Sequence, residues 1–287
     1  MKKEISIRCN DCHSDGINYD FTVFRPGGND TCLVSTDVIP SAEERIRINN
    51  FMQQIYPNIE QVGFVKFDLL LPELMMAGGE FCGNATRSAA WQSLNGKQGD
   101  VQIKVSGVKQ RLRAGVTEKQ EAYAQMPIYR DPQNISKDPK NLGNYTVRME
   151  GITHYLDFDT FQLEGLSAEE IKAKSMQKIR QRGLDQEPAA GIIYVSISEN
   201  GYEIIPVVYV RDVDSLYLET ACGSGTTALG MALALQSGRS IKEIPVLQPS
   251  GMSIEISVDY DGKEFKYAQI QGCIEKLSNG TIESNNI

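Results

Sequence analysis

Two cysteines, each followed by glycine and a short polar residue, are the residues of this chain best suited to chemistry. They lie in the motifs Cys82-Gly83-Asn84 and Cys222-Gly223-Ser224. Helix-favouring residues follow over 86–94 and 226–236, which predicts each thiol at a helix N-terminus. The unpaired amides and the dipole of a helix start favour an anion, so each thiol pKa is expected below its usual value of about 8.5. Two thiols in matching settings predict an acid and a base acting on opposite faces of one atom.

The surroundings of the two cysteines also repeat. Upstream, Ser41 and Ser167 each begin an amphipathic helix and have a glutamate three residues later, the pattern of a capping box. Downstream, the strand-like runs 101–105 and 244–247 each lead into a Ser-Gly turn. The common order of these features predicts two copies of one supersecondary unit.

The repeat suggests a division of the chain into two lobes. We expect an N-terminal lobe over 1–132, in which 1–16 form an extension, and a C-terminal lobe over 133–272. The proline-rich polar segment 126–144 is the expected linker. A last strand, predicted over 267–277, carries the chain into 273–287, which is expected to return to the first lobe.

Composition limits the class of protein and its partners. The chain has 287 residues, of which 41% are hydrophobic and 23% charged, as is usual for a soluble globular protein. A formal net charge of -8 argues against nucleic acid and favours a small polar metabolite as partner. No apolar run approaches the ~18 residues of a membrane span, and no signal peptide is visible, so we expect no membrane partner and a cytoplasmic location. The six cysteines are too few for a dense disulfide framework and are expected to be reduced.

Several motifs of this chain are similar to those of a known enzyme family. The chain resembles the diaminopimelate epimerase family of racemases that work without pyridoxal phosphate, and within it the histidine racemase branch of the staphylopine pathway. The resemblance rests on Pro26-Gly27-Gly28-Asn29-Asp30, on Glu60-Gln61-Val62-Gly63-Phe64 and on the two cysteine motifs, and it spans the chain from about residue 19 to the end. It implies an α/β (α+β) fold of two lobes related by a pseudo-twofold axis. Each lobe would wrap a mixed or antiparallel sheet around a central helix, with the site between the lobes.

The chemistry implied by this resemblance is a two-base racemisation. One thiolate removes the α-proton of an amino acid while the other thiol protonates the opposite face, so Cys82 and Cys222 are the expected catalytic pair. The resemblance implies no cofactor and no metal, and it allows a homodimer. The expected substrate-binding residues are Asn29, Glu60, Gly83, Asn84, Glu219, Gly223, Ser224 and Gly225.

Departures from the family pattern bear on the substrate. Asparagines that recognise the distal end of diaminopimelate are replaced in the segments 74–77, 151–154 and 188–191. Histidine is therefore the expected substrate, with conversion of the L to the D enantiomer. Diaminopimelate, lysine, arginine and ornithine stay open as alternatives. So do an isomerase that uses one thiol on another substrate and a binding or redox protein in which Cys82 and Cys222 form a disulfide.

The chain has two histidines, and neither is required by the two-thiol chemistry. His154 is expected to be structural, because a lone histidine is more often a satisfied core residue than a catalyst, although it can still line the site. His13 belongs to the run 9–13, which matches the c-type haem attachment pattern. Haem attachment needs export, and a metal bound by Cys9, Cys12 and His13 would lack a fourth ligand. A flexible or locally folded tail is the preferred interpretation.

Overall fold

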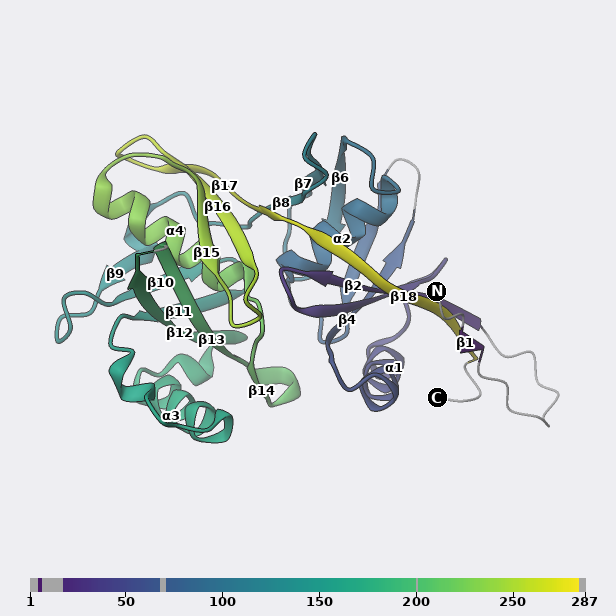
Figure 1. Ribbon diagram of the computed structural model, residues 1–287, viewed down its shortest axis with the longest axis horizontal. Coiled ribbons are helices and arrows are strands. Elements are labelled where there is room, and N and C mark those ends of the chain that lie inside the picture. Colours follow the sequence, from purple (N-terminus) through teal and green to yellow (C-terminus); the bar gives the residue numbers. More distant parts are fainter. Residues whose placement is uncertain (1–4, 7–17, 68–70, 200, 284–287) are drawn as a thin grey trace. The chain divides into compact units, whose positions relative to one another are not determined.

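A computed structural model describes residues 5–6, 18–67, 71–199 and 201–283. The chain divides into two compact units, one formed by the described residues of Met1–Ala122 and Cys273–Ile287 and the other by those of Tyr123–Gly272 (Figure 1). The division thus follows residue 122, whereas the sequence analysis placed it after 132. The reason is that β8 (Ala122–Gln125) pairs with β17 (Phe265–Gly272), a strand of the second unit.

The first unit is built on a mixed sheet. Its strands follow the order β18-β2-β3-β4-β5-β6-β7, with parallel pairing between β3 and β4 and between β5 and β6 and antiparallel pairing elsewhere. The short β1 (Ile5–Ser6) pairs in parallel with β18. The elements are β2 (Asn18–Pro26), β3 (Asp30–Ser35), α1 (Ala42–Ile55), β4 (Ile59–Lys66), β5 (Glu73–Met76), α2 (Gly83–Ser93), β6 (Gly99–Val105), β7 (Leu112–Val116) and β18 (Ile274–Glu283).

The second unit repeats this plan. Its strands follow the order β9-β10-β11-β12-β13-β15-β16-β17, again with two parallel pairings, β11 with β12 and β13 with β15; β14 pairs with the other end of β13. The elements are β9 (Ile135–Lys137), β10 (Tyr145–Met149), β11 (Ile152–Asp157), α3 (Ala168–Gln181), β12 (Ala189–Ser198), β13 (Gly201–Val210), β14 (Ser215–Leu218), α4 (Gly223–Ser237), β15 (Ile241–Leu247), β16 (Ser253–Tyr260) and β17. The predicted internal repeat is confirmed in the order of the elements.

Two sequence-based expectations were wrong in detail. The expected linker 126–144 contains a 3-10 turn (Pro132–Asn134) and β9, because Asp131 caps that turn and β9 finds a partner in β10. The single strand predicted over 267–277 is two strands, β17 and β18, which are separated at Cys273. β18 pairs antiparallel with β2 along most of its length, so the yellow strand in Figure 1 lies beside the purple one.

One buried helix lies at the centre of each unit. Helix α2 packs against β2, β3, β4, β6 and β7, and α4 packs against β10, β11, β13, β15, β16 and β17. Close approach of α4 to β16 requires glycine at 230, since a Cβ there would lie 2.4 Å from Ile256 Cγ1. Each sheet is therefore wrapped around a helix, and the α/β fold class is confirmed. None of the described helices has the length and apolarity needed to cross a membrane.

The outer helices α1 and α3 share the sequence pattern of a capping box, but only α3 forms the complete box. At the start of α3 the capping box is complete, since Ser167 N donates to Glu170 Oε2 (2.8 Å) and Glu170 N donates to Ser167 Oγ (3.4 Å). At the start of α1 the Glu44 amide donates to Ser41 Oγ, but the Glu44 carboxylate accepts a hydrogen bond from the Tyr19 hydroxyl (2.7 Å). The outer helix of the first unit is thereby tied to β2.

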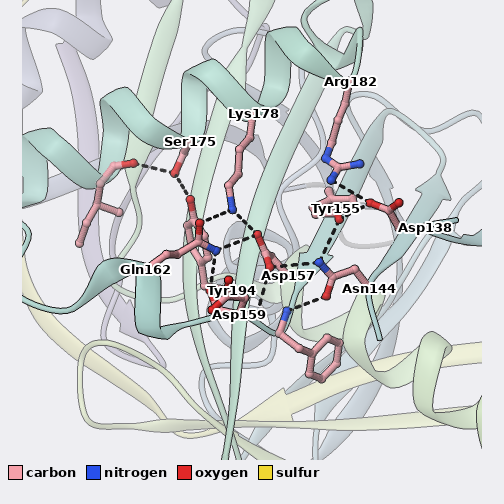
Figure 2. Close-up of polar contacts among 12 residues, drawn as sticks. Asp138, Asn144, Tyr155, Asp157, Asp159, Gln162, Ser175, Lys178, Arg182 and Tyr194 are labelled. Atoms are coloured by element: carbon pink, nitrogen blue, oxygen red, sulfur yellow. Dashed lines mark hydrogen bonds and ion pairs between the residues drawn. The ribbon is translucent and has the colours of Figure 1, made fainter. Parts of the chain in front are cut away.

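A polar network attaches α3 to the sheet of the second unit (Figure 2). The buried Asp157 carboxylate pairs with Lys178 and accepts hydrogen bonds from Asn144 Nδ2 (3.1 Å) and Gln162 Nε2 (3.1 Å). Lys178 Nζ also donates to Gln162 Oε1 (2.7 Å). The charges are thus both paired and hydrogen-bonded, which is the condition under which buried ions are tolerated.

Asp138 forms the second half of this network. Its Oδ2 atom accepts hydrogen bonds from the Tyr155 hydroxyl (2.5 Å) and Arg182 Nη2 (2.9 Å), and Oδ1 accepts one from the Lys140 amide (2.8 Å). The Arg182 guanidinium also stacks on the Tyr155 ring, 3.4 Å from its centroid. The hydrogen bond from Tyr155, supported by Lys140 and Arg182, lowers the pKa of Asp138 to about 2.

This lowered pKa predicts a loss of stability in acid. Because the folded pKa of Asp138 lies below the unfolded value of about 4, its contribution is complete above pH 4 and is lost as the pH falls toward about 2. Replacing Asp138 by Asn should lower stability at pH 6 and flatten its dependence on pH between 4 and 2.5. Urea unfolding midpoints of both proteins over this range measure the effect; two curves that stay parallel would contradict it.

Candidate active site

Both cysteines are the N-cap residues of the central helices. Cys82 precedes α2 with φ -132° and ψ 114°, and its Sγ accepts a hydrogen bond from the Ala85 amide (3.3 Å). Cys222 precedes α4 with φ -126° and ψ 106°, and its Sγ accepts one from the Gly225 amide (3.3 Å). A Cβ at position 225 would lie 2.7 Å from Ile193 Cδ1, so a larger residue there would require the Ile193 side chain to shift. The predicted helix N-terminal placement of both thiols is confirmed.

A polar residue just after the next strand fixes each cysteine loop. In the first unit Ser106 follows β6; its Oγ accepts a hydrogen bond from the Met76 amide (2.9 Å) and donates to the Glu80 carbonyl (2.5 Å). In the second unit Gln248 follows β15, and its Oε1 accepts a hydrogen bond from the Cys222 amide (3.0 Å). The loops are therefore held from the same position of the repeat, by different side chains.

In the first unit, polar side chains from β4 lie beside the expected site residues. The Cys82 thiol donates to Gln61 Oε1 (2.7 Å), and Asn29 Nδ2 donates to Glu60 Oε2 (2.7 Å). Asn29 is fully buried, and its Oδ1 accepts a hydrogen bond from Thr31 (2.8 Å). Asn29 and Glu60 are thus brought together as a pair, and Gln61 is a thiol partner that the sequence analysis did not single out.

A β-bulge explains how adjacent residues of β4 serve different partners. The pairing of β3 with β4 shifts between Asp30, which lies opposite Ile59, and Thr31, which lies opposite Gln61. Glu60 is the extra residue. Bulges of this kind redirect a side chain that a regular strand would place on the opposite face from its neighbour.

Asn84 is held by a buried arginine. Arg87 is fully buried and donates from Nε (3.3 Å) and Nη2 (3.2 Å) to Asn84 Oδ1. Because the oxygen is engaged on that side, the amide nitrogen of Asn84 forms the donor end. Burial lowers the pKa of Arg87 to about 10, so the side chain keeps its charge at neutral pH. The start of α2 therefore has a buried positive charge behind Asn84.

The environment of Cys222 has the opposite electrical character. Burial raises the pKa of this thiol well above its ordinary value, and the neighbouring Glu219 carboxylate adds to the increase through its charge and a hydrogen bond. The Ser224 hydroxyl and the Gly225 amide act in the other direction. The expected lowering of the thiol pKa by the helix start is therefore wrong for Cys222 in this state, because burial and the carboxylate outweigh it. Glu219, which was expected to bind substrate, is 8% exposed and lies beside the thiol.

His154 was not expected to have a required role, yet it lies next to this site. Its Nε2 atom is 2.8 Å from Ser224 Oγ, which in turn is 3.4 Å from Cys222 Sγ. Seventy positions separate His154 from Ser224, so no local motif connects them. The residues 9, 12 and 13 considered for haem or metal lie outside the described part of the chain.

Comparison with solved structures identifies the architecture. A hydroxyproline epimerase from Agrobacterium vitis aligns over 94% of this chain and 93% of its own, with a TM-score of 0.62 and 10% identity. A PhzF-family phenazine biosynthesis protein from Bacillus anthracis aligns over 93% and 99%, with a TM-score of 0.60 and 12% identity. At these identities the likeness concerns the fold.

Sequence comparison identifies the family. The model described as the histidine racemase CntK N-terminal domain matches residues 18–282. A histidine racemase from Fusobacterium nucleatum subsp. nucleatum is 30% identical over 278 residues, covering 92% of this chain and 96% of the relative. A histidine racemase from Staphylococcus aureus is 26% identical over 242 residues, covering 81% and 86%. The two cysteine N-caps thus occur in a chain that belongs to the histidine racemase family.

Proposed function

We propose that the protein is a cofactor-independent amino-acid racemase that inverts the α-carbon of histidine with Cys82 and Cys222 as its two bases. The observation that carries the proposal is the matched geometry of the two thiols, each the N-cap of a buried central helix. Membership of the histidine racemase family supports the reaction class, and the names of the relatives support the substrate.

The reaction would proceed by two proton transfers. A thiolate takes the α-proton of the amino acid as the C–H electron pair stays on carbon, and the thiol of the other cysteine gives its proton to the opposite face. After turnover the two cysteines have exchanged protonation states. Glu219 favours the protonated form of Cys222, and the buried charge of Arg87 favours an anion at Cys82. The two thiols therefore lie in different electrostatic fields, and Cys222 is the one favoured as a thiol before turnover.

The weak acidity of the α-proton sets the main energetic demand. Negative charge accumulates on the substrate carboxylate as the proton leaves, and preorganised donors stabilise that charge best. Amide groups at helix starts are such donors. The amides of Gly83, Asn84, Gly223 and Ser224 are proposed for this role, whereas the Gly225 amide, also expected to bind substrate, donates to Cys222 Sγ (3.3 Å).

The remaining residues would recognise the rest of the substrate. Glu60 and Glu219 are proposed for the amino and imidazole groups, since carboxylates accept hydrogen bonds from both. Asn29, whose amide is fixed between Glu60 and Thr31, would complete this surface. The resemblance to the staphylopine-pathway branch also implies a role in metallophore biosynthesis; this role, a cytoplasmic location and a homodimer stay predictions.

Proton NMR of the reduced protein in deuterated water tests the proposal. With L-histidine we expect the α-proton signal to disappear and D-histidine to form, as measured by chiral chromatography. A panel of diaminopimelate, lysine, arginine and ornithine serves as the comparison. Exchange with diaminopimelate alone would refute the assignment of histidine, and the absence of exchange with every amino acid would favour the isomerase or redox alternatives.

A further inference from the structure

A chain of three side chains connects β11 to the start of α4. His154 on β11 is fully buried, its Nε2 atom lies 2.8 Å from Ser224 Oγ, and Ser224 Oγ lies 3.4 Å from Cys222 Sγ. The ring is held from behind by the neighbouring strand, where Gly191 is its cross-strand partner. A Cβ at Gly191 would lie 2.4 Å from His154 Nδ1, so glycine is what leaves room for the imidazole.

The hydrogen-bond partners of its two ring nitrogens indicate which tautomer this imidazole adopts. Burial lowers the pKa of His154 to about 3, so the ring is neutral at physiological pH and one nitrogen carries the proton. Nδ1 is buried and has no hydrogen-bond partner among the described residues. A buried N–H group without an acceptor is costlier and rarer than an unpaired acceptor. The proton therefore lies on Nε2, which donates to Ser224 Oγ.

This tautomer determines what the serine hydroxyl can do. Once Ser224 Oγ accepts from His154, its own proton is available for the neighbouring sulfur, and 3.4 Å is a normal distance for a hydrogen bond to sulfur. We propose that His154 is a positioning residue that aims the Ser224 hydroxyl at Cys222 and so stabilises the Cys222 thiolate. This inference rests on the proposed function, in which Cys222 alternates between thiol and thiolate.

The series His154–Ser224–Cys222 helps the Cys222 thiol to ionise, which its surroundings otherwise oppose. Burial and the Glu219 carboxylate both oppose ionisation of Cys222, while the Gly225 amide and the Ser224 hydroxyl favour it. Half of the proposed catalytic cycle requires the thiolate. An oriented hydroxyl supplies a donor to the anion without adding a charge that would make the thiol permanently ionised. Because the His154 ring is neutral, it orients that donor without adding a charge beside Glu219.

Thiol reactivity tests the proposal without relying on racemase activity. In a Cys82→Ser background, the rate of Cys222 alkylation by iodoacetamide would be followed from pH 6 to 10, with the modified peptide quantified by mass spectrometry. His154→Phe fills the ring volume but has no donor. His154→Gln is the matched variant, because its amide nitrogen can reach the position of Nε2. Ser224→Ala removes the intermediate hydroxyl, and the double variant His154→Phe/Ser224→Ala completes a cycle.

We expect His154→Phe to slow Cys222 alkylation at pH 7.5 by about tenfold, the effect of a rise of about one unit in the thiol pKa. His154→Gln should recover most of the rate. Ser224→Ala should show the same slowing as His154→Phe, and the double variant should be no slower than either single one, since both act through one hydroxyl. Should His154→Phe fail to fold, as judged by circular dichroism, Ser224→Ala and His154→Gln still test the link from His154 through Ser224 to Cys222.

Unchanged alkylation in a folded His154→Phe protein, or additive effects in the double variant, would overturn the proposal. Its failure can be told apart from failure of the proposed function. A protein that exchanges no α-proton but shows the expected alkylation pattern would refute the proposed racemase activity and support the positioning role of His154. A racemase whose Cys222 reactivity ignores His154 and Ser224 would do the opposite.

Discussion

Replacing either Cys82 or Cys222 by serine should lower kcat for histidine racemisation by about 10²–10⁴-fold, the usual contribution of a positioned acid or base. A serine hydroxyl can still accept the helix amide hydrogen bond that the sulfur accepts from Ala85 or Gly225. It cannot form the required anion near neutral pH. The expected loss is therefore chemical, and measurement of kcat and KM by chiral chromatography should show kcat falling far more than KM changes.

Cys273→Ser is the matched control for both variants. Cys273 is an exposed free thiol at the break between β17 and β18, and its replacement should leave kcat within about twofold of the unaltered protein, as for surface substitutions away from special features. Full activity in Cys82→Ser or in Cys222→Ser would remove that cysteine from the two-base mechanism. An equal loss in Cys273→Ser would point to unfolding of the variants and not to a lost catalytic thiol.

The largest effect on stability is expected at Asp157. Its side chain is 4% exposed and is paired with Lys178, which is 19% exposed. Asp157→Ala would leave the lysine charge without its carboxylate, and breaking a buried pair in this way costs about 3–5 kcal/mol. Urea unfolding at neutral pH should therefore show a markedly lower midpoint at an unchanged slope.

The neighbouring Asp159 provides the control for this prediction. Its side chain is exposed, and it contacts the network through its main-chain amide and carbonyl groups. Asp159→Ala should stay within about 0.5 kcal/mol. The double variant Asp157→Leu/Lys178→Met should recover part of the loss, because it removes both charges together. A small effect of Asp157→Ala would show that water already solvates Lys178.

The sequence was sufficient to predict the cysteine helices and the repeat because these depend on local signals. Each thiol is followed by a run of helix-favouring residues, and the caps of the outer helices lie a few residues from the helices they begin. The capping box at Ser41 formed only by half, because Tyr19, on another element, binds the Glu44 carboxylate. Local rules predict such a pair; they do not exclude a competing partner brought by the fold.

The site residues that were missed depend on tertiary contacts. Gln61 contacts Cys82 next to a bulge at Glu60, where the register of β4 changes. The residue types in that segment do not predict the bulge. Gln248, just after β15, contacts the Cys222 amide, and His154, on β11, contacts Ser224. The thiol pKa was misjudged for the same reason. A helix start can be predicted from the chain, whereas burial and a nearby carboxylate become known only when the strands are assembled.

The pairing of β18 with β2 has a consequence for the order of folding. The sheet of the first unit needs residues 274–283, which lie at the far end of the chain from 18–26. The second unit is continuous over 123–272. During synthesis the second unit can complete its sheet as soon as β17 emerges from the ribosome, while β2 waits for a partner that is made later. The unit that is begun first is thus completed last.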